Sequence, residues 1–182
     1  MAAKDKPERV LKLSKPALLT DKHVLTAFDC GEETLNSFLQ KRALAAIAAR
    51  TANTVVVCRG KKVVGYFSLA NGAVAHEITS AKVRQNTPDP IPATVLARLA
   101  VDKTEQGKKL GEELLQEAGK RALAGAKYSA ARLLIVHALN ARAVTFYQRY
   151  GFAFLKAADR AAENDEPKPM YIALETLAAA LP

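Results

Sequence analysis

One stretch of the sequence decides the fold: Arg98-Leu-Ala-Val-Asp-Lys-Thr-Glu-Gln-Gly-Lys-Lys-Leu-Gly111. It begins as an apolar strand, passes through a short polar loop, and continues into a helix on which Leu114 and Leu115 mark the apolar face. The first N–H groups of a helix have no partner within the helix, and the helix dipole is positive at that end. The loop therefore predicts an anion site, at which Gly107 and Gly111 let a phosphate approach the main chain.

A second strand and helix follow farther along the chain. The run 133–138 is short and apolar, as expected for a buried strand. Asn140 stands where a residue caps the start of the next helix. Gly151 stands where the end of that helix favours a left-handed residue. The spacing thus predicts a strand, a helix and a turn between residues 133 and 151.

Taken together, these segments resemble the GNAT family of acetyl-CoA-dependent N-acetyltransferases. Residues 106–111 are similar to the family's pyrophosphate loop, Gln/Arg-x-x-Gly-x-Gly/Ala. The second segment is similar to Asn-x-x-Ala-x-x-Phe-Tyr-x-x-x-Gly-Phe, a pattern that is met by Asn140, Ala143, Phe146, Tyr147, Gly151 and Phe152. The resemblance implies an α/β (α+β) fold with a mixed, mostly antiparallel central sheet, helices on both faces, and a parallel strand pair that splays apart to admit the pantetheine arm.

The loop departs from the family pattern at one position. The first glycine of that pattern falls on Lys109. Because lysine has a Cβ atom, a positive φ angle and a tight approach of the main chain to a phosphate both become costly. Alternatively, the ammonium group of Lys109 contacts a phosphate. Both effects bear on cofactor affinity.

The resemblance also implies the binding site. Acetyl-CoA is the implied cofactor, and the implied binding residues are Leu99, Ala100, Val101, Gln106, Gly107, Lys108, Lys109, Leu110, Gly111, Asn140 and Phe146. The exposed edges of Leu99 and Val101 pair with the pantetheine amides as an added strand does. N–H groups near Val101 stabilise the oxyanion of the acyl-transfer intermediate. Asn140 orients the cofactor arm, caps its helix, or does both.

The implied catalytic residue is Tyr147, which maps on the tyrosine that protonates the departing thiolate. A phenol with a pKa near ~10 is a suitable donor to a thiolate with a pKa near ~8.5. The alternative is that the Tyr147 ring packs into the core. Tyr150 lies on roughly the same helix face, and we assign it mainly to packing.

No carboxylate stands at a convincing position for a general base. Asp102 is interpreted as a loop or cap residue, and Glu105 as a solvated loop charge. A lysine ε-amine, with a pKa near ~10.4, needs such a base, whereas an α-amine, with a pKa near ~7.7–8.0, is already partly neutral at about pH 7. The sequence therefore favours an α-amino group as the acetyl acceptor.

Length and composition indicate a single domain spanning residues 1–182, with a basic lead-in at residues 1–9 that we expect to be flexible. Hydrophobic residues make up 49% and charged residues 25% of the chain, which is typical of globular proteins. No apolar run reaches the length of a membrane span, and the N-terminus lacks an apolar signal core. We therefore expect a cytoplasmic protein with no membrane partner. Two cysteines are too few for a disulfide framework, and three scattered histidines have no zinc spacing, so no metal site is expected.

The net charge of +9 suggests a polyanionic partner such as nucleic acid. The alternative is a generically basic surface. Candidate contacts to nucleic-acid phosphates are Lys41, Arg42, Lys82, Arg84, Arg98, Arg142 and Arg149. We prefer Arg84 and Arg98, because we expect them to flank the acceptor side of the site. For each of these residues, the alternative is a solvated position or a local ion pair.

Further stretches resemble the GNAT toxins of bacterial toxin–antitoxin pairs. They include Phe28-Asp-Cys-Gly31, Gly65-Tyr-Phe67 and Pro90-Ile-Pro92, and the similarity runs from about Phe28 to Leu174. This resemblance implies transfer of acetyl from acetyl-CoA to the α-amine of aminoacyl-tRNA, which blocks translation. It also implies neutralisation by a ribbon-helix-helix antitoxin, and a homodimer. The alternatives are a protein or small-amine N-acetyltransferase and a non-catalytic GNAT-like module that binds nucleic acid.

The remaining pattern predicts the elements around the two motifs. We expect strands at 10–13, 54–58, 62–69, 94–101 and 133–138, and a strand pair formed by 152–156 and 170–174. We expect helices from Asp29 or Cys30 to Ala49, from the phosphate loop to Gly125, and over 175–181. Residues 71–92, which contain three prolines, are expected to form an irregular or partly helical insertion.

Overall fold

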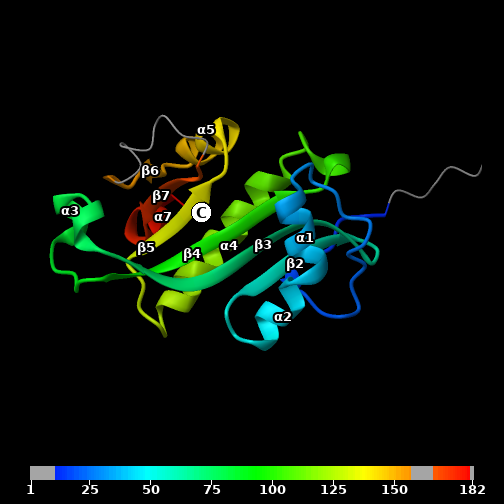
Figure 1. Cartoon of the computed structure of the whole chain (residues 1–182), viewed down its shortest axis with the longest axis horizontal. Coiled ribbons are helices and arrows are strands. Elements are labelled where there is room, and N and C mark those ends of the chain that lie inside the picture. Colours follow the sequence, from blue (N-terminus) through cyan, green and yellow to red (C-terminus); the bar gives the residue numbers. More distant parts are fainter. Residues whose placement is uncertain (1–10, 157–165, 181–182) are drawn as a thin grey trace, which may run out of the picture.

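The computed structural model describes residues 11–156 and 166–180, so the lead-in expected to be flexible lies outside the described residues. Within them, a seven-stranded sheet has the order β1-β2-β3-β4-β5-β7-β6 (Figure 1). The strands are β1 (Ala17–Leu18), β2 (Asn53–Arg59), β3 (Lys62–Val74), β4 (Ile91–Val101), β5 (Leu133–Ala138), β6 (Ala153–Phe154) and β7 (Lys168–Ala173). β4 and β5 pair in parallel, and all other neighbours in this sheet pair antiparallel. The predicted mixed, mostly antiparallel sheet is confirmed.

Helices cover both faces of the sheet. They are α1 (Glu33–Lys41), α2 (Ala43–Ala48), α3 (Ala81–Arg84), α4 (Leu110–Ala126), α5 (Ala141–Arg149) and α7 (Leu174–Ala180), with 3-10 turns η1 (His76–Ile78) and η2 (Lys103–Glu105). α4 and α7 share an apolar cluster on one face. On the other face, α1 packs over β2 and β3, and α3 packs over the start of β4 and β5 (Figure 1). None of the described helices is long and apolar enough to span a membrane.

Close packing between α4 and β3 fixes the position of the start of α4. Leu110 and Leu114 are almost completely buried against the sheet. A Cβ atom on Gly65 would lie 3.0 Å from Leu114 and 3.1 Å from Leu110, so the missing side chain lets the helix approach the strand. Burying each of these leucines contributes about 1.5–3 kcal/mol. The loop that precedes α4 is thereby held at the end of β4.

A β-bulge in β4 decides which side chains reach which face. Ser68 of β3 pairs with Arg98, but the next residue of β3, Leu69, pairs with Leu96, so Ala97 is an extra residue. Leu96 belongs to the cluster under α4, whereas the Arg98 guanidinium lies 3.7 Å from the Phe38 ring centroid of α1, on the opposite face. Side chains two apart normally share a face, so the bulge turns Arg98 away from α4.

The N-terminal boundaries differ from the prediction. The strand predicted at 10–13 is wrong, because the edge strand β1 lies at Ala17–Leu18 and Leu13 forms an isolated bridge; residue 10 lies outside the described residues. The single predicted helix ending at Ala49 is two helices, which break at Arg42, where φ is −123°.

The predicted start of the first helix is also wrong. The helix begins at Glu33, and Glu32 is its cap residue. Asp29 does not cap it, because its carboxylate binds the side chains of Lys103 and Asn36. The first helix therefore starts later than the predicted Asp29 or Cys30.

The insertion predicted at 71–92 is shorter than expected. β3 continues to Val74 and β4 begins at Ile91, so the irregular part is limited to residues 75–90, where η1 and α3 lie. α4 ends at Ala126, one residue beyond the predicted end. The other predicted strands and the terminal helix are confirmed to within a few residues.

Candidate functional site

β4 and β5 separate at the bulge and expose a strand edge. Their parallel pairing ends just before Ala97, whereas β4 continues to Val101. The N–H group of Asp102 donates to a carbonyl oxygen of β3 at 2.8 Å. Because backbone groups alternate in direction along a strand, the N–H groups of Val101 and Leu99 point the other way, toward the gap. Ala100 lies between them and its backbone faces β3, so this predicted residue does not contribute to the exposed edge.

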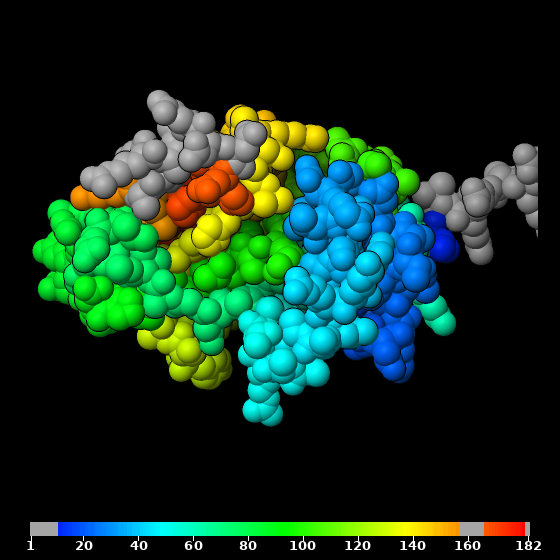
Figure 2. Space-filling view, in the orientation of Figure 1, coloured from blue at the N-terminus to red at the C-terminus, as the bar shows by residue number. Residues whose placement is uncertain are grey.

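The gap opens into a groove on the face that carries α1. In the space-filling view, β4 forms the recessed floor of this groove, between α1 on one side and β5 and β7 on the other (Figure 2). Arg98 projects from β4 on this same face and stacks on Phe38. One strand therefore offers an amide edge to the gap and a guanidinium to the groove.

The loop before α4 presents a row of unpaired main-chain N–H groups. Among the described residues, none accepts a hydrogen bond from an N–H group between Gln106 and Gly111. Gly107 and Lys109 both have left-handed backbone, with φ angles of +76° and +67°. Successive N–H groups at the positive end of a long helix form an anion site. The structure thus brings the predicted loop residues, Gly107, Lys108, Lys109, Leu110 and Gly111, together at the end of β4.

Lys109 adopts the conformation that is costly for a residue with a Cβ atom. It stands directly before α4, with φ of +67° and ψ of 2°. For an L-residue, this conformation costs about 1–2 kcal/mol. Its side chain is exposed and forms no ion pair with a described residue. The expected backbone cost is present, and the ammonium group remains accessible to an anion.

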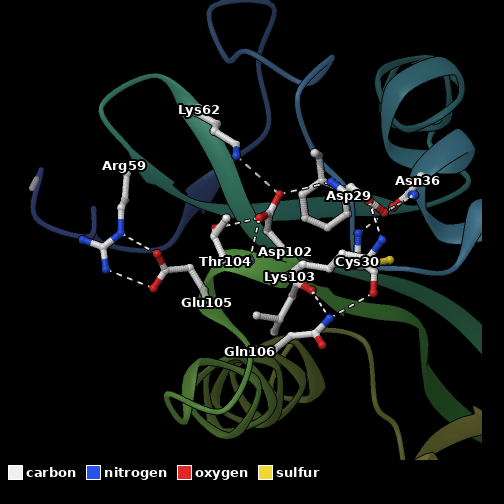
Figure 3. Close-up of polar contacts among 12 residues, drawn as sticks. Asp29, Cys30, Asn36, Arg59, Lys62, Asp102, Lys103, Thr104, Glu105 and Gln106 are labelled. Atoms are coloured by element: carbon white, nitrogen blue, oxygen red, sulfur yellow. Dashed lines mark hydrogen bonds and ion pairs between the residues drawn. The ribbon is translucent and has the colours of Figure 1, made fainter.

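Two polar side chains fix the loop to the turn that precedes α1 (Figure 3). The Gln106 side-chain amide donates to the carbonyl oxygens of Cys30 and Val101, both at 2.9 Å. Asp102 is 2% exposed. It accepts hydrogen bonds from the Asp29 N–H at 3.1 Å and from the N–H and hydroxyl of Thr104 at 3.0 and 2.7 Å. Gln106 therefore acts through its side chain as a tether, and its main-chain N–H group is the donor that remains for a ligand.

Hydrogen bonds and ion pairs lower the pKa values of three carboxylates around this loop. Lys103, the Gly31 N–H and Asn36 bring the pKa of Asp29 down to about 2. Burial raises the pKa of Asp102, but hydrogen bonds from Thr104 and Asp29 and the charge of Lys62 outweigh it, so the pKa is lowered. Each of these groups is a committed hydrogen-bond acceptor at neutral pH.

The prediction that Glu105 is a solvated loop charge is wrong, because the residue is only 4% exposed and is paired with Arg59. Its carboxylate accepts hydrogen bonds from Arg59 at 2.6 and 3.0 Å and lies 3.5 Å from the Lys108 ammonium. The Arg59 hydrogen bonds lower the pKa of Glu105. The interpretation of Asp102 as a cap residue is confirmed by its bond to the Thr104 N–H in η2. Neither carboxylate is free to act as a base.

Tyr147 combines a buried ring with a free hydroxyl. The residue is 7% exposed, and its ring packs against Phe146 and Phe152, with centroids 5.3 and 5.4 Å away. The hydroxyl makes no hydrogen bond to a described residue, yet it is not among the fully buried polar atoms that lack a partner. It therefore reaches the surface. Burial raises the pKa of Tyr147 to about 12, which keeps the hydroxyl protonated.

The caps of α5 set the direction of this helix. The Asn140 side chain accepts a hydrogen bond from the Ala143 N–H at 2.9 Å, and Gly151 has a φ angle of +83°. Both predicted helix signals are confirmed. The side-chain carbonyl of Asn140 is occupied by the cap, so the side-chain NH₂ is the part that a ligand could still use.

α5 also approaches the start of α4. A Cβ atom on Gly111 would lie 3.6 Å from Val101 and 4.0 Å from Phe146. Burial, together with the nearby Glu112 carboxylate, raises the pKa of the Tyr150 hydroxyl. The Tyr150 ring packs against Phe146, with centroids 5.1 Å apart, so the assignment mainly to packing is confirmed.

The predicted basic residues form three separate groups. Lys41, Arg42 and Arg98 line one hollow beside the break between α1 and α2. Lys82 and Arg84 line another with α3, at the other end of the sheet (Figure 1). Arg142 and Arg149 lie on α5. Arg84 and Arg98 therefore do not line one hollow.

Sequence reasoning missed the residues that hold the loop in place. Asn36 is 8% exposed; its side-chain oxygen accepts from the Cys30 N–H at 2.9 Å and its NH₂ donates to Asp29 at 3.0 Å. The sequence contained a signal for this role, because Asn36 is a polar residue on the apolar helix face marked by Leu35 and Leu39.

Comparison with known proteins agrees with this geometry. Residues 50–154 match the family model for an acetyltransferase (GNAT) domain. A tRNA-acetylating toxin of Mycobacterium tuberculosis is 42% identical over 139 residues, which cover 76% of this chain and 84% of that protein. AtaT complexed with acetyl-methionyl-tRNAfMet is 27% identical, with a TM-score of 0.80 over 93% of this chain and 99% of that chain. A tyrosine variant of the toxin AtaT, bound to the C-terminus of the antitoxin AtaR and acetyl-CoA, is 26% identical, with a TM-score of 0.75 over 93% of this chain and 97% of that chain.

Acid should destabilise the protein through Asp29, Asp102 and Glu105. Folding lowers the pKa of each carboxyl, so the stability that each supplies is fully present above its unfolded pKa, about 3.9–4.3. This stability is lost as the pH falls through the pKa of each group in the folded state, which is about 2 for Asp29. The free energy of unfolding in urea should therefore be nearly constant around pH 6 and fall between about pH 4.5 and about pH 2.

Asn at position 102 tests the source of this acid dependence. Asp102→Asn should lower stability at about pH 7 by about 1–3 kcal/mol, because the buried donors lose an acceptor, and should make the acid decrease shallower. The exposed Asp21→Asn is the matched control and should retain the wild-type slope. An unchanged slope in Asp102→Asn would contradict the assignment.

Substitution of Lys109 separates the backbone cost from the charge. Lys109→Gly should be about 1 kcal/mol more stable than Lys109→Ala in urea unfolding, because glycine alone adopts the left-handed conformation without strain. Both variants lack the ammonium group, so both should bind inorganic pyrophosphate more weakly than the wild type in calorimetry. Equal stability of the two variants would show that the conformation carries no strain.

Proposed function

Because the chain belongs to the GNAT family of acetyltransferases, we propose that it transfers the acetyl group of acetyl-CoA to the α-amine of an aminoacyl-tRNA. The observation that carries the donor half is the row of unpaired N–H groups from Gln106 to Gly111 beside the open edge of β4. The acceptor half is supported by the similarity to the tRNA-acetylating toxin and to the tRNA-bound AtaT.

The residues of the loop and strand fit acetyl-CoA. The N–H groups between Gln106 and Gly111 would bind its diphosphate, and the edge of Leu99 and Val101 would pair with the amides of its pantetheine arm. The Val101 carbonyl already accepts from Gln106, so its N–H group is the part left to stabilise the developing oxyanion. Acetyl-CoA supplies an activated thioester when bound.

Tyr147 is the proposed catalytic acid. Its pKa of about 12 lies above the ~8.5 of a model thiol, so simple equilibrium leaves the proton on the phenol. The hydroxyl therefore acts best as a hydrogen-bond donor to the departing sulfur. It passes its proton to that sulfur while the phenol oxygen receives a proton from another group. The absence of a hydrogen bond to a described residue leaves this hydroxyl available for that role.

The hollow formed by Lys41, Arg42 and Arg98 is the proposed entry for the acceptor end of tRNA. It adjoins the groove whose floor is β4, and its positive charges attract phosphodiesters. Burial lowers the pKa of the Arg98 guanidinium, but an arginine remains protonated at any physiological pH. An anionic partner would compensate the charge that this site leaves partly desolvated.

In this proposal the protein is a toxin that blocks translation in the cytoplasm, where charged tRNA is the substrate. A cognate antitoxin would neutralise it. The complex of AtaT with the C-terminus of AtaR supports a protein partner that binds through a terminal segment. A ribbon-helix-helix domain in that partner and a homodimeric toxin are further parts of the proposal.

Incubation with labelled acetyl-CoA tests the substrate. We expect label on aminoacyl-tRNA and none on the same tRNA after deacylation, because the acceptor is the amino acid's amine. Peptides with a free lysine and small polyamines are the controls. A preference for either of them would favour a protein or small-amine N-acetyltransferase, and no acetyl-CoA binding in calorimetry would favour a non-catalytic module.

Tyr147→Phe tests the catalytic role. The variant should keep its thermal stability within about 0.5 kcal/mol, since the hydroxyl has no bond to lose, and should bind acetyl-CoA normally. Its turnover should fall about 10²-fold or more, because the departing sulfur loses its proton donor. Tyr150→Phe is the matched control and should retain most turnover. Equal losses in the two variants would remove the special role of Tyr147.

A further inference from the structure

His137 is the polar exception in a strand of apolar residues. β5 reads Leu-Leu-Ile-Val-His-Ala, and every residue of it is buried except His137. Leu133 and Ile135 share its face of the sheet, but they are covered by Val83 and Leu155. That cover ends before His137, which leaves the imidazole exposed at the carboxyl end of β5.

The position of His137 places it beside the acyl-transfer groove. Val136, the residue before it, is the last residue of β5 that pairs with β4. His137 therefore stands where the two strands part. Alternation along β5 puts it on the face opposite Val136 and Ala138, which belong to the cluster under α4. This is the face that carries α1, Arg98 and the groove (Figure 2).

The imidazole has no partner among the described residues. Pro169 lies directly across from it in β7 and offers no N–H group or titratable group. Lys168 pairs with Ala138, one residue on, and so projects from the opposite face. From β4, Arg98 is the charged side chain on the same face, and it is stacked on Phe38. No carboxylate of these neighbouring strands competes for the imidazole.

We infer that His137 is the base that removes the proton from the attacking amine, an inference that rests on the proposed acetyl transfer. The nitrogen of a neutral amine forms a bond to the acetyl carbonyl carbon and becomes positively charged. His137 takes one proton from that nitrogen. The carbon–sulfur bond then breaks, and the sulfur leaves with the electron pair and receives the Tyr147 proton. The imidazolium returns its proton through water to the Tyr147 oxygen, so atoms and charge balance.

This assignment resolves the lack of a carboxylate base. Asp102 and Glu105 are committed to Thr104 and Arg59, and Asp29 is bound by Lys103. An imidazole exchanges protons readily near neutral pH, and it carries no negative charge that would repel RNA. The amine then enters from the groove on one face, while the thioester reaches the same point along the open edge of β4.

Rate measurements across a pH series test this inference. His137→Gln keeps the size and polarity of the side chain but cannot accept the proton. We expect its kcat with aminoacyl-tRNA to fall about 10²-fold at neutral pH, while the KM for tRNA changes by less than about 3-fold, since the substitution removes only one exposed contact. The acid limb of the wild-type kcat profile should disappear. Free imidazole should restore part of the rate in His137→Ala.

The controls separate this inference from the proposed function. His23→Gln, whose ring binds the Thr20 N–H on the far edge of the sheet, should retain wild-type kcat and its pH profile. If His137→Gln keeps its kcat, or raises KM alone with the acid limb intact, the inference is wrong although the protein acetylates tRNA. If the wild type leaves charged tRNA unlabelled, the proposed substrate is wrong. In that case the pH profile of kcat, measured for the wild type and His137→Gln with the amine that is acetylated, decides the role of His137.

Discussion

The buried carboxylate of Asp102 is the constraint on which the site depends. It collects hydrogen bonds from the backbone of Asp29, which lies 73 residues earlier, and from Thr104. Hydrogen bonds to an ionised acceptor contribute about 1.5–3 kcal/mol each. They fix the end of β4 to the turn before α1, and Gln106 adds a second tether to the same turn. The loop before α4 and the helix α1 are therefore positioned by one network.

The bulge at Ala97 gives a single strand two separate exposed features. It ends the pairing with β5, which opens an amide edge, and it shifts the side-chain alternation by one residue, which brings Arg98 to the groove. A regular strand would keep its partner and would turn a guanidinium into the apolar cluster under α4, at a large desolvation cost. The open amide edge and the guanidinium at the groove therefore have the same structural origin.

Local signals allowed part of this structure to be predicted. The strand, loop and helix around Gly107, the cap at Asn140 and the turn at Gly151 depend on residues close in sequence, and the structure confirms them. The bulge at Ala97 depends on the register with β3, and the contact between Asp29 and Asp102 depends on the packing of α1. Neither the bulge nor this contact is marked by a pattern in neighbouring residues of the sequence. The distribution of the basic residues over separate hollows leaves no local signal either, because α1, α3 and α5 meet different parts of the sheet.

The charges around the groove favour a neutral amine on an anionic carrier. Lys41, Arg42 and Arg98 share a hollow that no carboxylate of the described residues lines. A protonated amine would therefore meet repulsion there, and the same field would ease the loss of its proton. Polyamines and lysine side chains approach as cations and gain nothing from this surface. An aminoacyl ester carries its amine at the end of a polyanion, so its phosphates supply the attraction while its amine is already close to neutral. Under the proposed function, the electrostatics of the groove would discriminate among acceptors before any contact with the amino acid side chain is made.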